Sequence, residues 1–220
     1  MTEQQIPKLV ASLVEHQNKL APLSKEDGQW VIQNTTDAIA LFIRAIQGRQ
    51  ETEPRSENIL DLVSTVTIPA TTEEFIARDH FVVDTSKKAK VKISYLGDNF
   101  RKNFLGKTEE VIPEITLRYH KLRKSSVDKP IIAELGGDKK AETTLAEMFA
   151  LMEMQPNGEK GDLLTNGYAN IFYIYCPTGV LGTVRCGWDG VGWSVGACSF
   201  GSPYEWSSGG QVFSRNSSES

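Results

Sequence analysis

Residues Tyr168–Phe200 read YANIFYIYCPTGVLGTVRCGWDGVGWSVGACSF, and this stretch gives the clearest indication of the fold. It contains three runs rich in aromatic and β-branched residues, which are typical of strands: Tyr168–Tyr175, Thr183–Trp188 and Trp193–Phe200. Turn-forming residues separate the runs. Pro177-Thr178-Gly179 follows the first, and Asp189-Gly190, a pair favoured in type I′ hairpin turns, follows the second. The pattern predicts a three-stranded antiparallel meander.

Two segments upstream of this stretch alternate apolar and polar residues with a period of two, which is the pattern of a half-buried strand. They are Lys90–Tyr95 and Glu114–His120. Parity places Tyr95 and Tyr119 on the apolar faces, pointing into the core, and His120 on the polar face. We expect both strands to join the meander in one antiparallel sheet.

Helical patterns account for much of the remaining middle of the chain. The expected helices are Ile59–Val66, Glu73–Asp79, Asp98–Leu105 and Asp138–Gln155, and Phe81–Val83 is expected to be a short strand. The last of these helices has an apolar stripe at helical spacing, formed by Leu145, Met148, Phe149 and Met152. We expect this helix to cover one face of the sheet.

The N-terminal region has a different pattern. Apolar residues recur at helical spacing over residues 4–21, Pro22 interrupts them, and Ser24 begins a second helix. A connection this short predicts an antiparallel helical hairpin over residues 1–48. Residues 49–58 contain almost no apolar side chain, which is typical of a linker. After the domain of residues 59–206, the serine- and glycine-rich residues 207–220 are expected to form a polar tail.

The predicted fold class is therefore α+β, with an N-terminal antiparallel helical hairpin followed by a mixed domain whose antiparallel sheet ends in the three-stranded meander. The chain has 220 residues, and its 40% hydrophobic residues are enough for a core. No apolar stretch approaches the ~20 residues that span a bilayer, and the N-terminus lacks the pattern of a signal peptide. An odd number of cysteines, three, argues against a disulfide framework. We expect a soluble cytoplasmic protein with no membrane partner.

Charge is distributed unevenly along the chain. Residues 87–124 carry eleven Lys and Arg against four acidic residues, a net charge of +7, whereas the whole chain carries −4. A basic segment in an acidic protein favours an anionic partner, either an acidic protein or nucleic acid. The candidate anion-binding residues are Lys90, Lys92, Arg101, Lys102, Arg118, Lys121, Arg123 and Lys124. The same charges also fit a solvated face, or lysines that protect a strand edge from unwanted pairing.

Aromatic residues gather in the last third of the chain, which holds three of the four tryptophans. Tyr204 and Trp206 lie beyond the last strand of the meander. They are the candidate partner-binding residues, because exposed aromatic side chains are typical of recognition surfaces. The alternative is that their segment packs back onto the sheet.

The sequence contains no motif of a catalytic or metal site. Cys176, Cys186 and Cys198 have nine and eleven residues between them, which is not the spacing of a zinc site. They are expected to be buried thiols that pack as small hydrophobic side chains. One of them could instead be a nucleophile, with His120 or His80 as its base. No cofactor is predicted.

These observations favour a non-enzymatic interaction protein whose basic segment binds an anionic partner. The helical hairpin would mediate assembly of a homo-oligomer. Two alternatives stay open on the sequence alone. One is a cysteine-dependent hydrolase or transferase, and the other is a structural component of a larger assembly.

Overall fold

The computed structural model describes residues 58–198 and 203–215. The chain divides into two units, residues 1–57 and 58–220, so every described residue belongs to the second unit. The predicted helical hairpin of residues 1–48 lies outside the described residues, as does the predicted linker up to Glu57.

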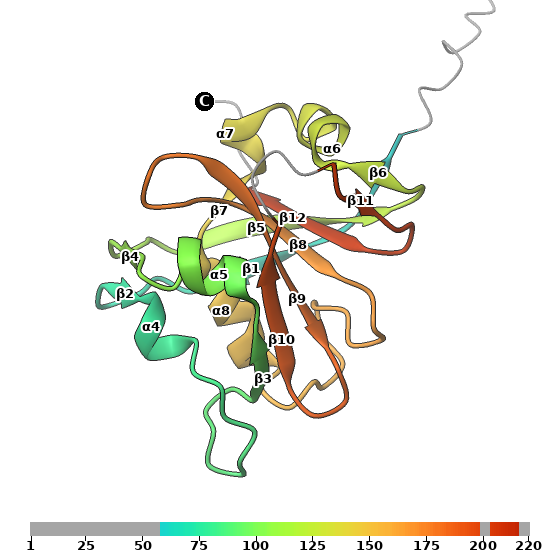
Figure 1. The fold of residues 1–220 in the computed structure, drawn as a ribbon. Coiled ribbons are helices and arrows are strands. Elements are labelled where there is room, and N and C mark those ends of the chain that lie inside the picture. The colour runs from blue at the N-terminus through green and yellow to red at the C-terminus, as the bar shows by residue number, and fades with distance from the viewer. Residues whose placement is uncertain (1–57, 199–202, 216–220) are drawn as a thin grey trace, which may run out of the picture. The chain divides into compact units, whose positions relative to one another are not determined.

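The described part of the chain is built on one eight-stranded mixed sheet with the order β1-β5-β12-β8-β9-β10-β3, to which β7 adds by pairing with β8 (Figure 1). Its strands are β1 (Leu60–Ile68), β3 (Ile93–Leu96), β5 (Ile115–Leu122), β7 (Glu142–Thr143), β8 (Asn170–Tyr175), β9 (Leu181–Trp188), β10 (Trp193–Ala197) and β12 (Gln211–Arg215). Two smaller sheets pair β2 (Phe75–Ile76) with β4 (Thr108–Glu109), and β6 (Ser126–Val127) with β11 (Glu205–Trp206). The helices are α4 (Ala77–His80), α5 (Asp98–Asn103), α6 (Asp128–Glu134), α7 (Asp138–Ala141) and α8 (Leu145–Met154).

The predicted α+β fold class, with an antiparallel sheet ending in the meander, is wrong. The described region is dominated by its sheet, and that sheet is mixed, because β12 and β7 run parallel to β8 and β3 runs parallel to β10. The three meander strands do pair antiparallel in chain order, β8 with β9 and β9 with β10. They lie inside the sheet, however, with β12 on one side and β3 on the other.

The predicted polar tail is also wrong for residues 207–215, because they contain β12. This strand lies between β5 and β8, and its residues Gln211 to Ser214 are buried. Phe213 stacks on Phe172 with ring centroids 4.7 Å apart. The buried polar side chain of Gln211 donates from Nε2 to the backbone oxygen of Asp162. Only partners elsewhere in the fold make so polar a strand stable in the interior.

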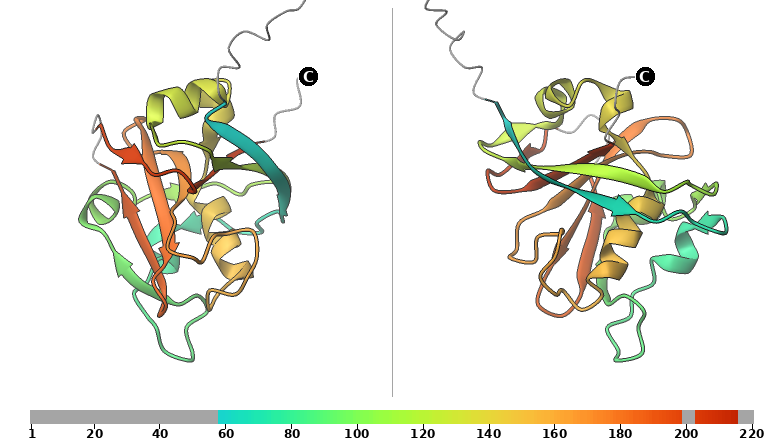
Figure 2. Two further views of the ribbon diagram at one scale, coloured as in Figure 1. Left: turned by 90° about the vertical axis from the view of Figure 1, so that its right-hand side faces the viewer. Right: turned by 180° about the vertical axis from the view of Figure 1, so that it is seen from behind.

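Both faces of β8 are covered. On β8, Phe172 and Ile174 join the core that includes α8, whereas Ile171 and Tyr173 join a second core with residues of α6, α7 and β11. Figure 2 shows α8 on one side of the sheet and α6 with α7 together at one end. A strand buried on both faces needs no alternation of polar and apolar residues, which explains the continuous apolar run in this segment.

The predicted helix over Asp138–Gln155 is divided. It consists of α7, the two-residue strand β7, and α8. Thr144 and Glu147 form a capping box that starts α8: Thr144 Oγ1 accepts from Glu147 N at 3.1 Å, and Glu147 Oε2 accepts from Thr144 N at 2.8 Å. The Glu109 carboxylate accepts from the next two backbone N–H groups, at 3.0 and 2.8 Å. These contacts satisfy the helix start and fix it at this position.

The other local predictions had mixed outcomes. The helix predicted over Asp98–Leu105 is confirmed as α5, which ends at Asn103. The helix predicted over Ile59–Val66 is wrong, because the chain from Leu60 onward is strand β1, where β-branched residues outweigh the helical spacing. Of Glu73–Asp79, only the part from Ala77 is helical, and Phe81–Val83 is not a strand. The prediction that Tyr95 points into the core is wrong. Tyr95 is 55% exposed because the pairing of β3 with β10 shifts register beside it.

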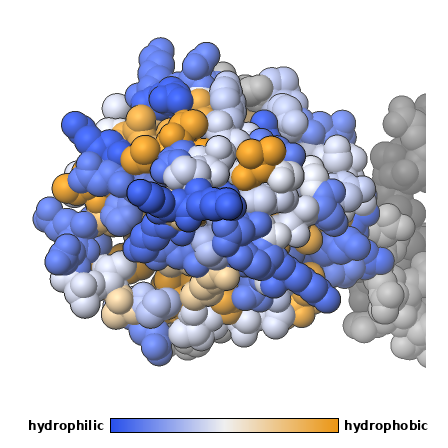
Figure 3. Space-filling view, turned by 90° about the horizontal axis from the view of Figure 1, so that it is seen from below, coloured by the Kyte–Doolittle hydropathy of each residue, from blue (hydrophilic) through white to orange (hydrophobic). Residues whose placement is uncertain are grey.

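The strands change direction along the sheet, so β1 and β5 run across the direction of β10 and β3 (Figure 1). This is the right-handed twist of a large sheet. On the face seen from below, hydrophobic residues appear in separate groups within a mostly hydrophilic surface (Figure 3). Within the described ranges, no helix is long and apolar enough to cross a membrane.

Candidate functional site

The structure divides the predicted anion-binding residues into two groups. Lys90 and Lys92 precede β3, and Arg101 and Lys102 lie on α5, which follows β3. Arg118 and Lys121 lie on β5, and Arg123 and Lys124 follow it. Four strands separate β5 from β3 in the sheet order, so residues 87–124 do not form one basic surface.

Several of these cations have partners within the protein. Lys90 Nζ lies 2.5 Å from Glu153 Oε1, and Arg123 Nε lies 3.3 Å from Asp61 Oδ2. Arg101 donates from Nε to the backbone oxygen of Leu96 at 2.9 Å. Their positive charge or hydrogen-bonding capacity is therefore partly used, and exposed pairs of this kind contribute little to stability.

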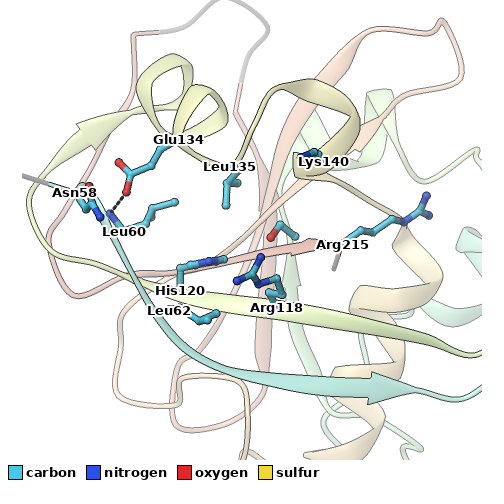
Figure 4. A pocket seen from close by; sticks show the side chains of 10 residues that line it. Asn58, Leu60, Leu62, Arg118, His120, Glu134, Leu135, Lys140 and Arg215 are labelled. Carbon is cyan, nitrogen blue, oxygen red and sulfur yellow. Dashed lines mark hydrogen bonds between the residues drawn. The ribbon is translucent and has the colours of Figure 1, made fainter. Parts of the chain in front are cut away.

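A polar cavity of about 350 Å³ lies beside the β5 group, among β1, β5, β12 and the α6–α7 region (Figure 4). Its charged and polar lining includes Arg118, His120, Glu134, Lys140, Ser214 and Arg215. Arg118 and His120 lie two residues apart on β5, so their side chains share one face of the sheet. Lys140 comes from α7 and Arg215 from the end of β12. We call this cavity the Arg118 pocket.

The two arginines of the Arg118 pocket differ in their partners. Arg215 donates from Nε and Nη2 to Glu147 Oε1, at 3.2 and 3.1 Å. Burial raises the pKa of Glu147, and the Arg215 guanidinium opposes this shift. Arg118, by contrast, makes no hydrogen bond or ion pair with any residue in the described ranges, although it is half-buried. Its five N–H donors are therefore available to a ligand.

His120 contributes a second unused group. Its Nδ1 atom is buried and has no hydrogen-bond partner among the described residues. Burial lowers the pKa of His120, and the neighbouring Arg118 lowers it further, so the imidazole is neutral at pH 7. Buried polar atoms without a partner are rare in folded proteins, because burial removes their contact with bulk water. A ligand in the cavity reaches this nitrogen only when the side chains that cover it move aside.

Among the described residues, a single carboxylate lines the Arg118 pocket, and it has a structural role. Glu134 accepts from the backbone N–H groups of Ile59 and Leu60, at 2.8 and 3.0 Å, and so ties the start of β1 to α6. Figure 4 shows the hydrogen bond with Leu60. Of the cations in the lining, Arg215 is paired with Glu147, whereas Arg118 has its donors unused among the described residues. The pocket can therefore accept an anion at Arg118. No cluster of His, Cys, Asp and Glu in the described ranges has the composition of a metal site.

The cysteines lie away from the Arg118 pocket, which none of them lines. Cys186 is fully buried, and burial raises the pKa of its thiol. Burial likewise raises the pKa of Cys198. At Cys176 burial also acts to raise the pKa, but hydrogen bonds from Thr178 and nearby backbone outweigh it, and the net pKa is lowered.

The two predicted partner-binding residues have different environments. Tyr204 is 49% exposed, but Trp206 is only 3% exposed. Trp206 is part of the core beside α6, and its Nε1 donates to Asp128 Oδ1 at 2.7 Å. Trp206 is therefore not exposed, because its segment packs back through the pairing of β11 with β6 and through the core that it shares with β8. A partner-binding role for Tyr204 and Trp206 stays a prediction.

Comparisons with protein-family models, with curated proteins and with solved structures found no match to this chain. The Arg118 pocket is therefore interpreted from its geometry. The alternation of apolar and polar residues along Glu114–His120 already placed Arg118 and His120 on one face of a strand. No sequence pattern pointed to Lys140 or Arg215, because each comes from an element far along the chain.

Proposed function

We propose that this protein is a binding protein that holds an anionic group of a partner molecule, a carboxylate or a phosphate, in the Arg118 pocket. The observation that carries the proposal is the half-buried residue Arg118, whose guanidinium has no hydrogen-bond or ion-pair partner in the described ranges. A partly buried cation without an anion loses hydration with no compensating contact. A bound carboxylate or phosphate would supply that contact, because both match the two-pronged geometry of guanidinium.

The surrounding groups support an anion in this place. Lys140 adds a second positive charge, and the unpartnered Nδ1 of His120 adds a hydrogen-bonding group among the described residues. The acid of the lining, Glu134, already accepts two backbone hydrogen bonds. Its carboxylate is therefore only partly available to pair with the cations of the pocket in place of a bound anion.

A single anionic group fits the geometry better than a polyanion such as nucleic acid. Proteins that bind nucleic acid place cations along a continuous track, so that several phosphates are neutralised together. Here the basic residues lie in two groups at separated strands, and Lys90 and Arg123 are already ion-paired.

Titration with sulfate and with acetate, followed by backbone amide NMR shifts, tests the proposal. We expect both anions to shift signals of residues that line the Arg118 pocket. Arg118→Gln should weaken sulfate binding about tenfold, the loss of one charged hydrogen-bonding partner. Lys121→Gln is the matched control, because Lys121 lies exposed on the same strand and does not line the pocket.

Two results would contradict this function. Equal affinity of the Arg118→Gln and Lys121→Gln variants for sulfate would show that the pocket does not bind the anion. Binding to a single-stranded oligonucleotide that falls steeply with salt, and that is lost equally on changing Lys92, Arg118 or Lys121, would instead indicate a polyanion site.

A further inference from the structure

A second cavity, of about 280 Å³, lies around Tyr204 and Trp206, and it shares no described lining residue with the Arg118 pocket. Its lining comes from the loop before β8, from β8 and β9, and from the segments around β11 and before β12. The residues that give it chemical character are Tyr168, Arg185, Tyr204 and Trp206. We call it the aromatic cavity.

Aromatic side chains form much of the aromatic cavity. Tyr168 and Tyr204 are 45% and 49% exposed, so a ligand can reach their rings. Tyr204 packs edge-on against Trp206, with centroids 4.7 Å apart and an interplanar angle of 61°. Trp206 is itself fixed by its hydrogen bond to Asp128. Rings held in this way give a preorganised apolar surface at low entropic cost.

Glycine at position 209 preserves the position of one ring. Gly209 has φ +97°, in the left-handed region, and a Cβ atom there would lie 2.8 Å from Cε1 of Tyr168. Any other residue would both strain the backbone and displace the tyrosine. The Tyr168 ring therefore occupies the space that a side chain at position 209 would otherwise fill.

Arg185 gives the aromatic cavity its charge. It lies exposed on β9, and within the described ranges it makes no hydrogen bond or ion pair. Its guanidinium lies beside the backbone of β10, since a Cβ atom on Gly196 would be 3.7 Å from Nε of Arg185. No carboxylate of the described residues lines the cavity. An anionic substituent on a ligand would therefore meet a cation with its donors unused.

We propose that the aromatic cavity binds a small planar aromatic ring that carries an anionic group, with the ring against the tyrosines and the anion on Arg185. The volume is just below the range typical of sites for drug-sized ligands, so it suits a single ring rather than a larger molecule. This site is additional to the Arg118 pocket. The anionic group can be a carboxylate or a phosphate, because guanidinium binds both.

Benzoate is the probe, and the NMR signal of the Trp206 indole N–H, assigned with Trp206→Phe, reports binding in the cavity. We expect saturation with a dissociation constant of about 1 mM or lower. Benzamide has the ring without the charge, and acetate has the charge without the ring. Both should bind at least about tenfold more weakly than benzoate, as measured by the Trp206 signal. Phenyl phosphate should bind in place of benzoate, and its relative affinity distinguishes the two kinds of anion.

Two variants test which residue binds the anionic group of the ligand and which binds its ring. Arg185→Gln should weaken benzoate binding about tenfold and make it similar to benzamide binding. Tyr204→Ala should weaken benzoate and benzamide alike. Tyr95→Ala is the matched control, because Tyr95 is an exposed tyrosine that does not line the cavity. Arg185 and Tyr204 are both exposed, so these variants should fold as the original chain does.

The proposal would be overturned by any of three results. These are no shift of the Trp206 signal with benzoate at about 10 mM, equal binding of benzamide and benzoate, and benzoate binding that Arg185→Gln leaves unchanged. Benzoate binding lost in Arg118→Gln but kept in Arg185→Gln would place it in the other pocket. The two sites can therefore fail separately.

Discussion

The Arg118 pocket and the aromatic cavity each contain one arginine with unused donors, but the surroundings of the two arginines differ. Arg118 has ionisable neighbours, Lys140, His120 and Glu134. Arg185 has aromatic ones, and no other charged residue of the described ranges lines its cavity. The comparison shows that a cation alone does not define a ligand. In the Arg118 pocket the charge of the ligand supplies most of the interaction, whereas in the aromatic cavity the ring supplies area and the charge supplies orientation.

The two cavities also differ in how their arginine is kept available. Near Arg118, the buried Glu147 binds the other arginine, Arg215, and leaves Arg118 without an acidic partner in the described part of the chain. Near Arg185, the acid Asp128 is occupied by neutral donors: Trp206 Nε1, Tyr173 Oη and Thr183 Oγ1, at 2.7, 3.1 and 2.7 Å. In both places a carboxylate stabilises the fold beside a binding cavity without pairing with Arg118 or Arg185.

Replacing Asp128 should produce the largest difference between ligand binding in the aromatic cavity and ligand binding in the Arg118 pocket. Asp128→Ala leaves three buried or half-buried donors without their acceptor, and each such group costs about 1–3 kcal/mol. We expect the free energy of unfolding to fall by about 4 kcal/mol, measured by urea denaturation. Benzoate binding should be lost because Trp206 is no longer fixed, while sulfate binding at Arg118 persists.

The control for this variant is Asp138→Ala, which removes an acid from the first turn of α7. It should cost no more than about 1 kcal/mol. A similar loss of stability in the two variants would show that the hydrogen bonds to Asp128 are not a special support of this region.

The pH dependence of binding should differ between the cavities because a histidine lines the Arg118 pocket, whereas no histidine of the described residues lines the aromatic cavity. The pKa of His120 is lowered from 6.5 by burial and by Arg118, so the free imidazole is neutral at pH 7. A bound anion favours the imidazolium, raises its pKa, and is therefore accompanied by proton uptake. Sulfate keeps its charge in this range, so its affinity should rise as the pH falls from about 7.5 to 5.5, by less than tenfold per unit.

Benzoate binding in the aromatic cavity should be nearly constant over the same range. His120→Gln should remove the pH dependence of sulfate binding, and His80→Gln is the control. The pKa of His80 is also lowered mainly by burial, but His80 does not line the Arg118 pocket. Sulfate affinity that rises equally in the His120→Gln variant would rule out a contribution from this imidazole.

The smallest expected effect concerns the partner of Arg215. Glu147→Gln removes the charge that holds the Arg215 guanidinium, so a second arginine becomes available to the Arg118 pocket. Sulfate affinity should rise about threefold, less than the value of a full charged contact, because freeing the side chain costs entropy on binding. Benzoate binding should not change.

Glu153→Gln serves as the comparison, since Glu153 is also an ion-paired acid of α8 but holds Lys90 outside the pocket. If both variants raise sulfate affinity equally, the gain comes from net charge. Calorimetric titration of the two variants at one ionic strength distinguishes these cases.

Local pattern predicted those parts of the fold that depend on neighbouring residues. The turns around Pro177-Thr178-Gly179 and Asp189-Gly190 indicated the meander, and its strands pair as expected. Alternation in Glu114–His120 indicated β5 and placed Arg118 beside His120. These features follow from the period of a strand and from turn chemistry, both of which act over a few residues.

Pairing between distant segments was decided only by the tertiary structure. Gln211 and Ser214 are polar, yet β12 lies centrally because Gln211 finds a partner in Asp162 and Phe213 packs on Phe172. The parallel pairings that make the sheet mixed have the same origin, since no turn connects such strands locally.

The candidate sites depend on both levels. The sequence by itself established that basic residues are concentrated in 87–124, and that alternation places Arg118 and His120 on one face of a strand. Folding then separated most of the basic residues, paired Lys90 and Arg123 with acids, and brought Lys140 and Arg215 to Arg118. The physical reason is that net charge is a sum over residues and can be counted from the sequence. A binding pocket, in contrast, needs donors from several elements to lie close together while the nearby acids are bound to other groups.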